Sequence, residues 1–294
     1  MNSRSISLIK LATSMVVFGT IGLFVRYIPL PSSMIALIRG IIGTCFLLVV
    51  MSLKKRKISV EAVKSNLIWL LLSGCAIGFN WILLFESYRY TSVAVSTLCY
   101  YTAPLIVILA SPLILKERLT IKHIICVATA LLGMFFISGI FRSGIPKLNE
   151  LKGILFGIGA AVLYASVMLL NTKIKEIGAY DKTILQLSVS AVVLIPYCLL
   201  TVDFSHLQMD CIAFVMILIV GVIHTGLTYF LYFGAMGHLK PQTVAVLSYI
   251  DPLVAVAVSA LILKEHVGIE TLFGAILILG SSLISELPAK ERIS

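Results

Sequence analysis

Charged residues are scarce in this chain. Only 12% of its 294 residues are Asp, Glu, Lys or Arg, whereas 60% are hydrophobic and the mean hydropathy is +1.07. A soluble domain carries charge on about a quarter of its residues, so this composition excludes a water-soluble protein. Lipid offers no hydrogen-bond partner to the backbone, and long apolar runs must therefore cross it as helices. The composition predicts an all-α integral membrane protein.

The chain also lacks the patterns of several chemical functions. Its six cysteines show no CxxC or CxxxC spacing, and most lie in apolar runs, where Cys behaves as a small hydrophobe. The sequence contains no HExxH or GxSxG motif and no clustered His and Asp. We therefore expect no metal, no cofactor and no enzymatic activity. A membrane-embedded enzyme acting on a lipid-linked substrate is the alternative.

The net charge of +10 does not indicate a nucleic-acid partner, because the basic residues occupy short segments such as Lys54–Lys57 between apolar runs. Lys and Arg collect in the cytoplasmic loops of membrane proteins. With a cytoplasmic N-terminus, most of the 23 basic residues fall on the cytoplasmic side. The distribution predicts a multi-pass protein of the cell (inner) membrane with both termini in the cytoplasm.

Ten apolar runs are long enough to cross about 30 Å of hydrocarbon. The separators between them are short, and each is polar or contains proline. The first run resembles a signal sequence but lacks an A-x-A cleavage site, so we expect it to be retained as a span. The predicted spans cover approximately residues 8–25, 33–53, 66–86, 92–115, 120–141, 151–171, 182–202, 211–233, 241–263 and 268–287.

The sequence repeats itself at an offset of 148 residues. Tyr101–Leu105 recurs as Tyr249–Leu253, with a shared Tyr-x-x-Pro-Leu pattern. Leu113–Glu117 recurs as Leu261–Glu265, with the shared sequence Leu-Ile-Leu-Lys-Glu. Composition alone does not reproduce two such motifs at one offset, and the chain therefore contains two copies of one unit.

Each copy contains five of the predicted spans. An odd number of crossings places the second copy upside down relative to the first, an arrangement typical of transporters that alternate between two conformations. We predict ten transmembrane helices in two inverted five-helix repeats, residues 1–143 and residues 144–294.

These motifs resemble those of the EamA-type transporters, which belong to the drug/metabolite transporter superfamily. The resemblance covers nearly the whole chain as two tandem units. It implies ten helices, cytoplasmic termini, a central cavity between the halves and movement of small organic solutes. The residues that carry it are Pro104 with the run 115–120, Pro252 with the run 263–265, and Phe18–Thr20.

Polar residues within the apolar runs are the candidates for a solute site, because a polar group in hydrocarbon is costly unless it is paired or hydrated. Some of them form a helical stripe of hydroxyl groups that follows His224. For His224 itself, a hydrogen bond to a nearby hydroxyl is the alternative. The predicted substrate-binding residues are Asn80, Trp81, Tyr100, Tyr101, Tyr164, His224, Thr228, Tyr229 and Tyr249.

Two carboxyl groups are candidates for proton coupling. Asp251 lies near the predicted middle of the ninth run, and a structural hydrogen bond at a kink is its alternative role. Glu86 closes the third run and could instead pair with Arg89 at the external interface. Arg39 in the second run is expected to pair with one of these carboxylates; snorkelling or attraction of an anionic substrate are its alternatives.

Pro104 and Pro252 are the predicted hinges. Each removes one backbone hydrogen bond from its span, which leaves the carbonyls of Tyr100 and Ser248 without helical donors. Such carbonyls at matched positions can bind a solute or ease bending. A static kink covered by a neighbouring helix is the alternative.

The predicted function is secondary transport of a small organic metabolite across the inner membrane by alternating access. A polar set rich in Tyr, Thr and Asn suits a polar or amino acid-like solute, and export is the favoured direction. The expected partners are the solute and the lipid bilayer, and the expected assembly is a monomer or a homodimer.

Overall fold

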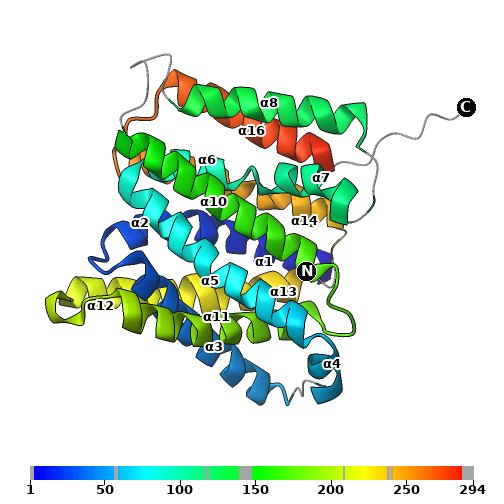
Figure 1. Cartoon of the computed structure of the whole chain (residues 1–294), viewed down its shortest axis with the longest axis vertical. Helices are drawn as coiled ribbons and strands as arrows, with labels where there is room; N and C mark the ends of the chain where they lie inside the picture. Colours follow the sequence, from blue (N-terminus) through cyan, green and yellow to red (C-terminus); the bar gives the residue numbers. More distant parts are fainter. Residues whose placement is uncertain are drawn as a thin grey trace, which may run out of the picture.

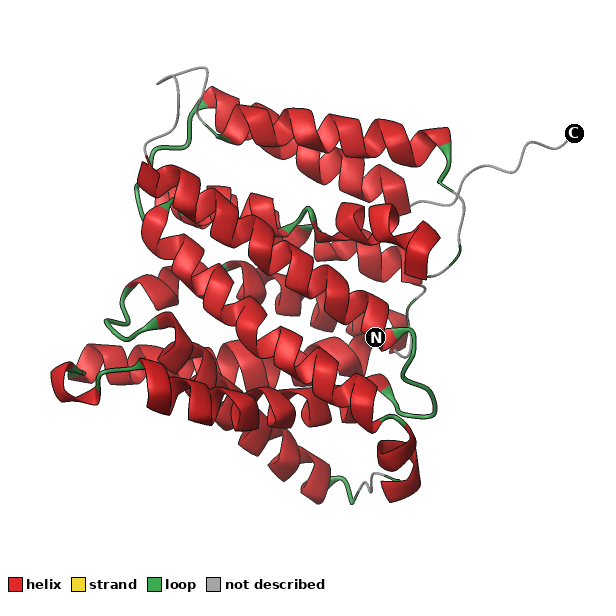
Figure 2. Ribbon diagram, in the orientation of Figure 1, coloured by secondary structure: helices red, strands yellow, loops and turns green. Residues whose placement is uncertain are grey.

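In a computed structural model of the chain, every regular element of the described residues is helical (Figures 1 and 2). The helices of its first half are α1 (Ser3–Gly19), α2 (Ile21–Arg26), α3 (Ser32–Leu53), α4 (Val60–Ser65), α5 (Leu67–Tyr90), α6 (Val93–Tyr100), α7 (Ala103–Ile114) and α8 (Ile121–Ile137). The described residues are 3–55, 59–114, 116, 119–138, 148–207, 209–236, 239 and 241–286.

The second half is also helical throughout its described part. One of its segments is a π-helix that continues directly from α12 into α13. The elements are α10 (Leu148–Asn171), α11 (Ala179–Thr201), a 3₁₀ turn (Phe204–His206), α12 (Cys211–Leu218), the π-helix (Ile219–Leu227), α13 (Thr228–Met236), α14 (Pro241–Ser248), α15 (Ile250–Leu261) and α16 (Ile269–Glu286).

Among the described residues, seven helical stretches are long and apolar enough to span a membrane, which confirms the predicted class of all-helical membrane protein. All ten predicted runs coincide with apolar helices, but three of the helices are shorter than a full span. The predicted count of ten crossings therefore stays an expectation. The shorter helices are Ile121–Ile137, Val246–Leu261 and Ile269–Ser285.

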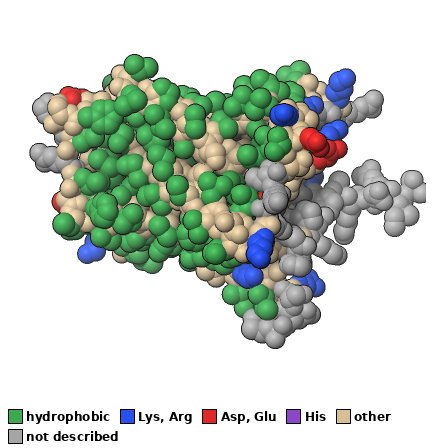
Figure 3. Space-filling model, turned by 90° about the horizontal axis from the view of Figure 1, so that it is seen from below, with side chains coloured by type: hydrophobic (Ala, Val, Ile, Leu, Met, Phe, Trp, Pro, Cys, Tyr) green, Lys and Arg blue, Asp and Glu red, His purple; other side chains and the backbone are tan. Residues whose placement is uncertain are grey.

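The sides of the helix bundle are apolar. Large aliphatic side chains point outward along most helices, among them Leu113, Leu200 and Ile269, which are exposed by 86%, 87% and 84%. Figure 3 shows hydrophobic side chains over most of one face, with most of the visible Lys and Arg toward its right-hand end. A surface of this kind would aggregate in water and is suited to lipid.

The chain begins and ends at the same end of the bundle. In Figure 1, α1 starts and α16 finishes at the right, where α4 also lies. The end of α2 and the start of α12 lie at the opposite end. Asn66 follows α4 and donates a hydrogen bond to the carbonyl of Lys175 at 2.9 Å, so the loop between α10 and α11 lies at the end that carries the termini.

Helices of the two copies pack in reciprocal pairs. The equivalent helices α8 and α16 pack on each other, as do α3 and α11. α1 packs on α13 and α15, while its equivalent α10 packs on α5 and α7. Likewise α3 lies against the π-helix and α11 against α5. Reciprocal packing is what a twofold relation between two similar units produces.

One pair of contacts breaks this reciprocity. α6 packs along α15, but the equivalent pair, α14 and α7, makes no comparable contact among the described residues. The two copies are therefore joined more closely on one side of the molecule's centre than on the other.

Candidate functional site

Two of the predicted spans are broken at equivalent positions. Tyr101 and Thr102 separate α6 from α7, and Tyr249 separates α14 from α15. Pro104 and Pro252 lie in the first turn of the helix that follows each break, where a missing N–H costs no helical hydrogen bond. The prediction that each proline lies within one continuous kinked helix is therefore wrong, since each lies in the first turn of a new helix.

The two breaks face each other across the boundary between the copies. The hydroxyl of Tyr101 donates to Oδ2 of Asp251 at 2.8 Å and approaches the carbonyl oxygen of Ser248 at 3.3 Å. The Ser248 carbonyl, which the sequence predicted to lack a helical donor, thus has a donor from the other copy. A carboxyl group and a backbone carbonyl from one repeat meet a phenol from the other at the point where both spans are interrupted.

Glu265 ties the end of α15 to the start of α6. Its Oε2 accepts hydrogen bonds from the N–H of Val93 at 2.9 Å and from the hydroxyl of Ser259 at 2.5 Å. Its Oε1 pairs with the guanidinium of Arg26, which also donates to the carbonyl of Thr91. Since the end of α15 adjoins the start of α6, the span α6–α7 and its equivalent span α14–α15 run antiparallel.

Tyrosines surround the crossing of α6 and α15. The ring of Tyr100 stacks on that of Tyr164, with centroids 5.1 Å apart. Tyr101 lies 6.0 Å from Tyr100 and 6.1 Å from Tyr249, measured between ring centroids. These four predicted residues therefore lie together with Asp251, although Tyr164 remains 40% exposed.

Gly19 explains how α1 reaches this crossing. A Cβ at this position would lie 2.5 Å from the carbonyl oxygen of Asp251 and 2.7 Å from Cβ of Val254. No side chain larger than hydrogen fits there unless the helices separate. The residue allows α1 and α15 to pack backbone against backbone beside the candidate carboxylate.

Arg39 is the second charged group in the interior. Its side chain is only 3% exposed, and its Nε donates to the hydroxyl of Thr225 at 3.1 Å. The guanidinium carbon lies 4.0 Å from the centre of the Trp81 ring and 5.4 Å from that of Phe85. The predicted ion pair with Asp251 or Glu86 is wrong, because no such pair exists among the described residues.

The π-helix presents Thr225 to Arg39. Within this segment, side chains bond to carbonyls five residues back: the hydroxyl of Thr225 donates to Val220 at 3.0 Å and that of Thr228 to Ile223 at 2.7 Å. Gly43 on α3 leaves no room for a Cβ beside Thr225, so α3 lies in direct contact with the segment. π-helical turns within α-helices are frequent at functional sites.

His224 lies on the same π-helix and is 1% exposed. Its Nε2 is 3.0 Å from the hydroxyl of Thr20, and its ring meets that of Phe24 at 4.8 Å in an edge arrangement. The hydroxyl contact is the structural alternative that the sequence left open for this residue.

Tyr229 lies in the same interior region. Its ring packs on Phe18 at 5.3 Å, and both Tyr229 and Tyr100 pack against the buried core cluster that contains Trp81 and Phe85. Tyr100 also lies beside Tyr101, and the two rings Trp81 and Phe85 lie beside Arg39. The tyrosine cluster and the Arg39–Trp81 pair are therefore parts of one polar region inside the bundle.

The predicted residues Asn80 and Glu86 form hydrogen bonds with adjacent helices. Asn80 donates to the carbonyl of Ala160 at 2.5 Å and joins α5 to α10. Glu86 accepts a hydrogen bond from Ser32 at 2.6 Å. The alternative pairing of Glu86 with Arg89 is wrong among the described residues, since Arg89 donates to the carbonyl of Leu30 instead.

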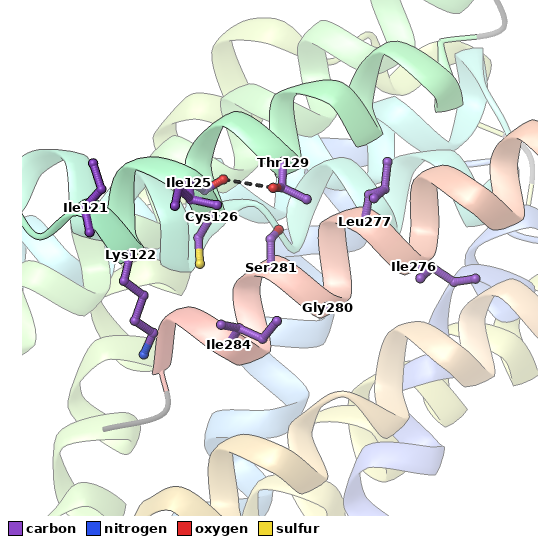
Figure 4. Close-up of a pocket in the computed structure, with 10 residues that line it drawn as sticks. All are labelled: Ile121, Lys122, Ile125, Cys126, Thr129, Ile276, Leu277, Gly280, Ser281 and Ile284. Carbon is purple, nitrogen blue, oxygen red and sulfur yellow. Dashed lines mark hydrogen bonds between the residues drawn. The ribbon is translucent and has the colours of Figure 1, made fainter. Parts of the chain in front are cut away.

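A groove of about 530 Å³ lies between α8 and α16 (Figure 4). Figure 4 shows it lined mainly by aliphatic side chains, with Lys122 at one end and the Thr129 hydroxyl bonded to its own helix. Its lining and its place between α8 and α16 distinguish it from the polar region at the α6–α15 crossing. Within the described ranges, no group of three or more His, Cys, Asp and Glu is placed to hold a metal ion.

Reasoning from the sequence missed Arg26 and Glu265. Glu265 carried a signal, because it ends the repeated Leu-Ile-Leu-Lys-Glu motif. Its counterpart Glu117 lies outside the described residues. Arg26 carried no comparable signal, since it acquires its role from a partner far away in sequence. Thr225 belonged to the predicted polar stripe after His224, but the stripe did not indicate its contact with Arg39.

Comparison with known proteins agrees with this architecture. Residues 5–139 and again residues 151–286 match the EamA-like transporter family. The chain belongs to this family. The double match confirms the predicted resemblance and its repetition along the chain, and it makes the protein a multi-pass membrane protein of a transporter family.

Relatives within the EamA-like transporter family extend over most of the chain. The uncharacterized transporter YxxF of Bacillus subtilis (strain 168) is 31% identical over 86% of this chain and 80% of its own length. An uncharacterized transporter of Archaeoglobus fulgidus is 28% identical over 66% of this chain and 67% of its own. A solved crystal structure shares the fold with a TM-score of 0.64 over 96% of both chains, at 16% identity.

Proposed function

We propose that this protein is a secondary transporter that moves a small organic solute across the cell membrane by alternating access. The observation that carries the proposal is the crossing of two interrupted helices from opposite repeats, at which Tyr101 of one binds Asp251 of the other. Interrupted helices at matched positions supply helix ends and unbonded carbonyls inside a membrane, which an uninterrupted helix does not.

The proposed architecture has ten crossings in two inverted halves, residues 1–143 and 144–294. Reciprocal packing of the equivalent helices supports the twofold relation, and the antiparallel course of α6–α7 and α14–α15 supports the inversion. The excess of Lys and Arg at the end that carries the termini supports their cytoplasmic placement in the inner membrane.

The unequal packing of equivalent helices supports alternating access. α6 and α15 are joined at the end where Glu265 contacts Arg26 and Val93, whereas α7 and α14 make no comparable contact among the described residues. By the internal symmetry, a second conformation would join α7 to α14 and release α6 from α15. With cytoplasmic termini, the present arrangement is closed to the outside, and a solute would enter the site from the cytoplasm, as export requires.

The solute would bind at the polar region between the halves. Tyr100, Tyr101, Tyr229 and Tyr249 provide hydroxyl groups and ring faces there, and Trp81 forms the wall behind Arg39. Asp251 is the proposed proton carrier, because it is a carboxyl group at the crossing with no basic partner among the described residues. Glu86, bonded to Ser32, is the less central candidate.

The function is tested by reconstituting the purified protein into liposomes and exposing them to a pooled mixture of metabolites. Mass spectrometry would compare the contents of these vesicles with empty vesicles, with and without an imposed pH gradient. Enrichment of one solute class in the protein-containing vesicles is the expected result. Folded protein that enriches no member of a broad pool would contradict the proposal.

A further inference from the structure

We propose that Arg39 is the binding site for a carboxylate group carried by the transported solute. This inference rests on the proposed transport function and adds the class of substrate to it. It concerns a residue that was expected to be neutralised by a carboxylate of the protein and that has no such partner in the described part of the chain.

Arg39 has no counter-ion among the described residues. A buried guanidinium is costly in a membrane protein unless an anion, water or several acceptors compensate it. Arg39 is 3% exposed, and its one hydrogen bond among the described residues runs from Nε to Thr225. The ion pair found in those residues belongs to Arg26 and Glu265 at the end of the bundle. The charge of Arg39 is therefore left for a ligand to neutralise.

The guanidinium of Arg39 is held along one edge and on one face. Thr225 binds its Nε edge, and Trp81 covers one face at 4.0 Å. The two terminal nitrogens make no hydrogen bond to a described residue and remain as donors. A guanidinium held in this way presents its paired N–H groups as a fork, which matches the two oxygens of a carboxylate.

Arg39 and its hydrogen-bond partner Thr225 come from opposite halves of the chain. Arg39 comes from α3 of the first copy, and Thr225 comes from the π-helix of the second. Tyr100 and Tyr229 pack against the core cluster that contains Trp81, whose ring lies on the Arg39 guanidinium, and the ring of Tyr100 lies 6.0 Å from that of Tyr101, which bonds to Asp251. A solute whose carboxylate binds Arg39 would therefore extend into the tyrosine-lined region that contains Asp251.

Trp81 provides a direct probe of this site. The chain has two tryptophans, Trp69 and Trp81, so Trp69→Phe leaves a single tryptophan, which lies against the Arg39 guanidinium and can be excited selectively over tyrosine. The purified Trp69→Phe protein would be titrated separately with acetate, propionate, L-alanine and L-leucine. Acetamide, propionamide, L-alaninamide and L-leucinamide serve as matched probes without the carboxylate, and inorganic phosphate serves as a different oxyanion.

We expect a saturable change in Trp81 fluorescence with at least one of the acids and none with its amide. Arg39→Gln in the same background should weaken that binding at least tenfold. Arg39→Lys keeps the charge but loses the fork, and it should weaken binding by an intermediate factor. Arg89→Gln is the matched control, because Arg89 bonds to the carbonyl of Leu30 near the end of the bundle, and it should leave the affinity unchanged.

The outcomes separate this inference from the transport proposal. Solute uptake by liposomes together with equal responses of Trp81 to acids and amides would overturn the carboxylate site and leave transport standing. A carboxylate response that requires Arg39, in protein that transports nothing, would support the site and count against the carrier. A response to phosphate but to none of the acids would also overturn the carboxylate assignment. If Arg39→Gln fails to fold, Arg39→Lys decides the question through the ratio of acid to amide affinity.

Discussion

Asp251 and Arg39 differ from the other polar residues of the spans in the partners that they have. Asn80 and Glu86 are occupied by a carbonyl and a hydroxyl of adjacent helices, as expected of polar groups that hold a membrane bundle together. Asp251 receives its hydrogen bond from Tyr101 at the crossing of the two interrupted spans, and that bond must break if α6 separates from α15. The charged side chains of the interior are thus linked to the relative position of the two copies.

Replacement of Asp251 by Asn tests its role as a proton carrier. Asn keeps the size of the side chain and can still accept a hydrogen bond from Tyr101, but it cannot exchange a proton. We expect solute uptake driven by a pH gradient to disappear, while exchange of solute across the membrane at equal pH continues. Asp203→Asn in the exposed loop after α11 is the control. Gradient-driven uptake that survives in Asp251→Asn would rule out this assignment.

Replacement of Gly19 by Ala tests the close approach of α1 and α15. The added methyl group would overlap the carbonyl oxygen of Asp251, so the helices must move apart, and overpacking of this kind costs about 1–3 kcal/mol. We expect a lower midpoint of thermal unfolding in detergent. Gly234→Ala is a matched control, because no atom lies within 4 Å of the added Cβ there. Equal midpoints for the two variants would show that the packing at Gly19 tolerates a side chain.

At the scale of elements, the ion-paired cluster at Glu265 should hold α6 against α15. Glu265→Gln retains hydrogen bonds to Val93 and Ser259 but loses the charge that pairs with Arg26. A loss of about 1 kcal/mol would shift the balance between two conformations about fivefold. We therefore expect faster modification of the buried Cys99 on α6 by a small thiol reagent.

This measurement needs a background from which the other accessible cysteines, Cys45, Cys75 and Cys211, have been removed. Glu270→Gln at the start of α16 is the control, because Glu270 has no ion pair among the described residues. Unchanged reactivity of Cys99 in Glu265→Gln would mean that the cluster does not hold this end closed.

The positions of the helices were largely predictable from the sequence, whereas the contacts between side chains distant in sequence were not. Runs of about twenty apolar residues have one stable form in lipid, and this is why the predicted spans coincide with helices. The repeated Tyr-x-x-Pro pattern marked the interruptions, although each proline begins a helix instead of bending one. The contacts of Arg39 with Trp81 and of Glu265 with Val93 join distant residues, and no local pattern encodes such distances.

The whole molecule combines two similar copies with unequal contacts between them. Reciprocal packing holds for the outer pairs of helices, while the inner pair α6–α15 is packed together and its counterpart α7–α14 makes no comparable contact in the described part of the chain. A protein with identical copies in identical surroundings would have no reason for this difference. The proposed alternating access would explain the unequal contacts, because it requires two conformations of similar energy, each closed at a different end of the bundle. Such a pair of conformations agrees with the proposed inverted arrangement of the two halves.

The orientation of the molecule in the membrane is tested by thiol labelling in intact cells. Cys211 is exposed at the start of α12, at the end of the bundle opposite the termini, and no basic residue lies between Asp203 and Asp210. Lys173 is exposed in the loop after α10, beside the end of α4, at the other end of the bundle. With cytoplasmic termini, these two positions face opposite sides of the membrane.

We expect a membrane-impermeant maleimide to label the native protein at Cys211 in intact cells, and Cys211→Ser to abolish that labelling. In the Cys211→Ser background, Lys173→Cys should react only after the cells are permeabilised, because the surplus of Lys and Arg around that end retains it in the cytoplasm. The opposite pattern would invert the topology. The end closed by Glu265 would then face the cytoplasm, and the conformation described here would accept its solute from outside, so the same experiment also decides whether this arrangement suits export or uptake.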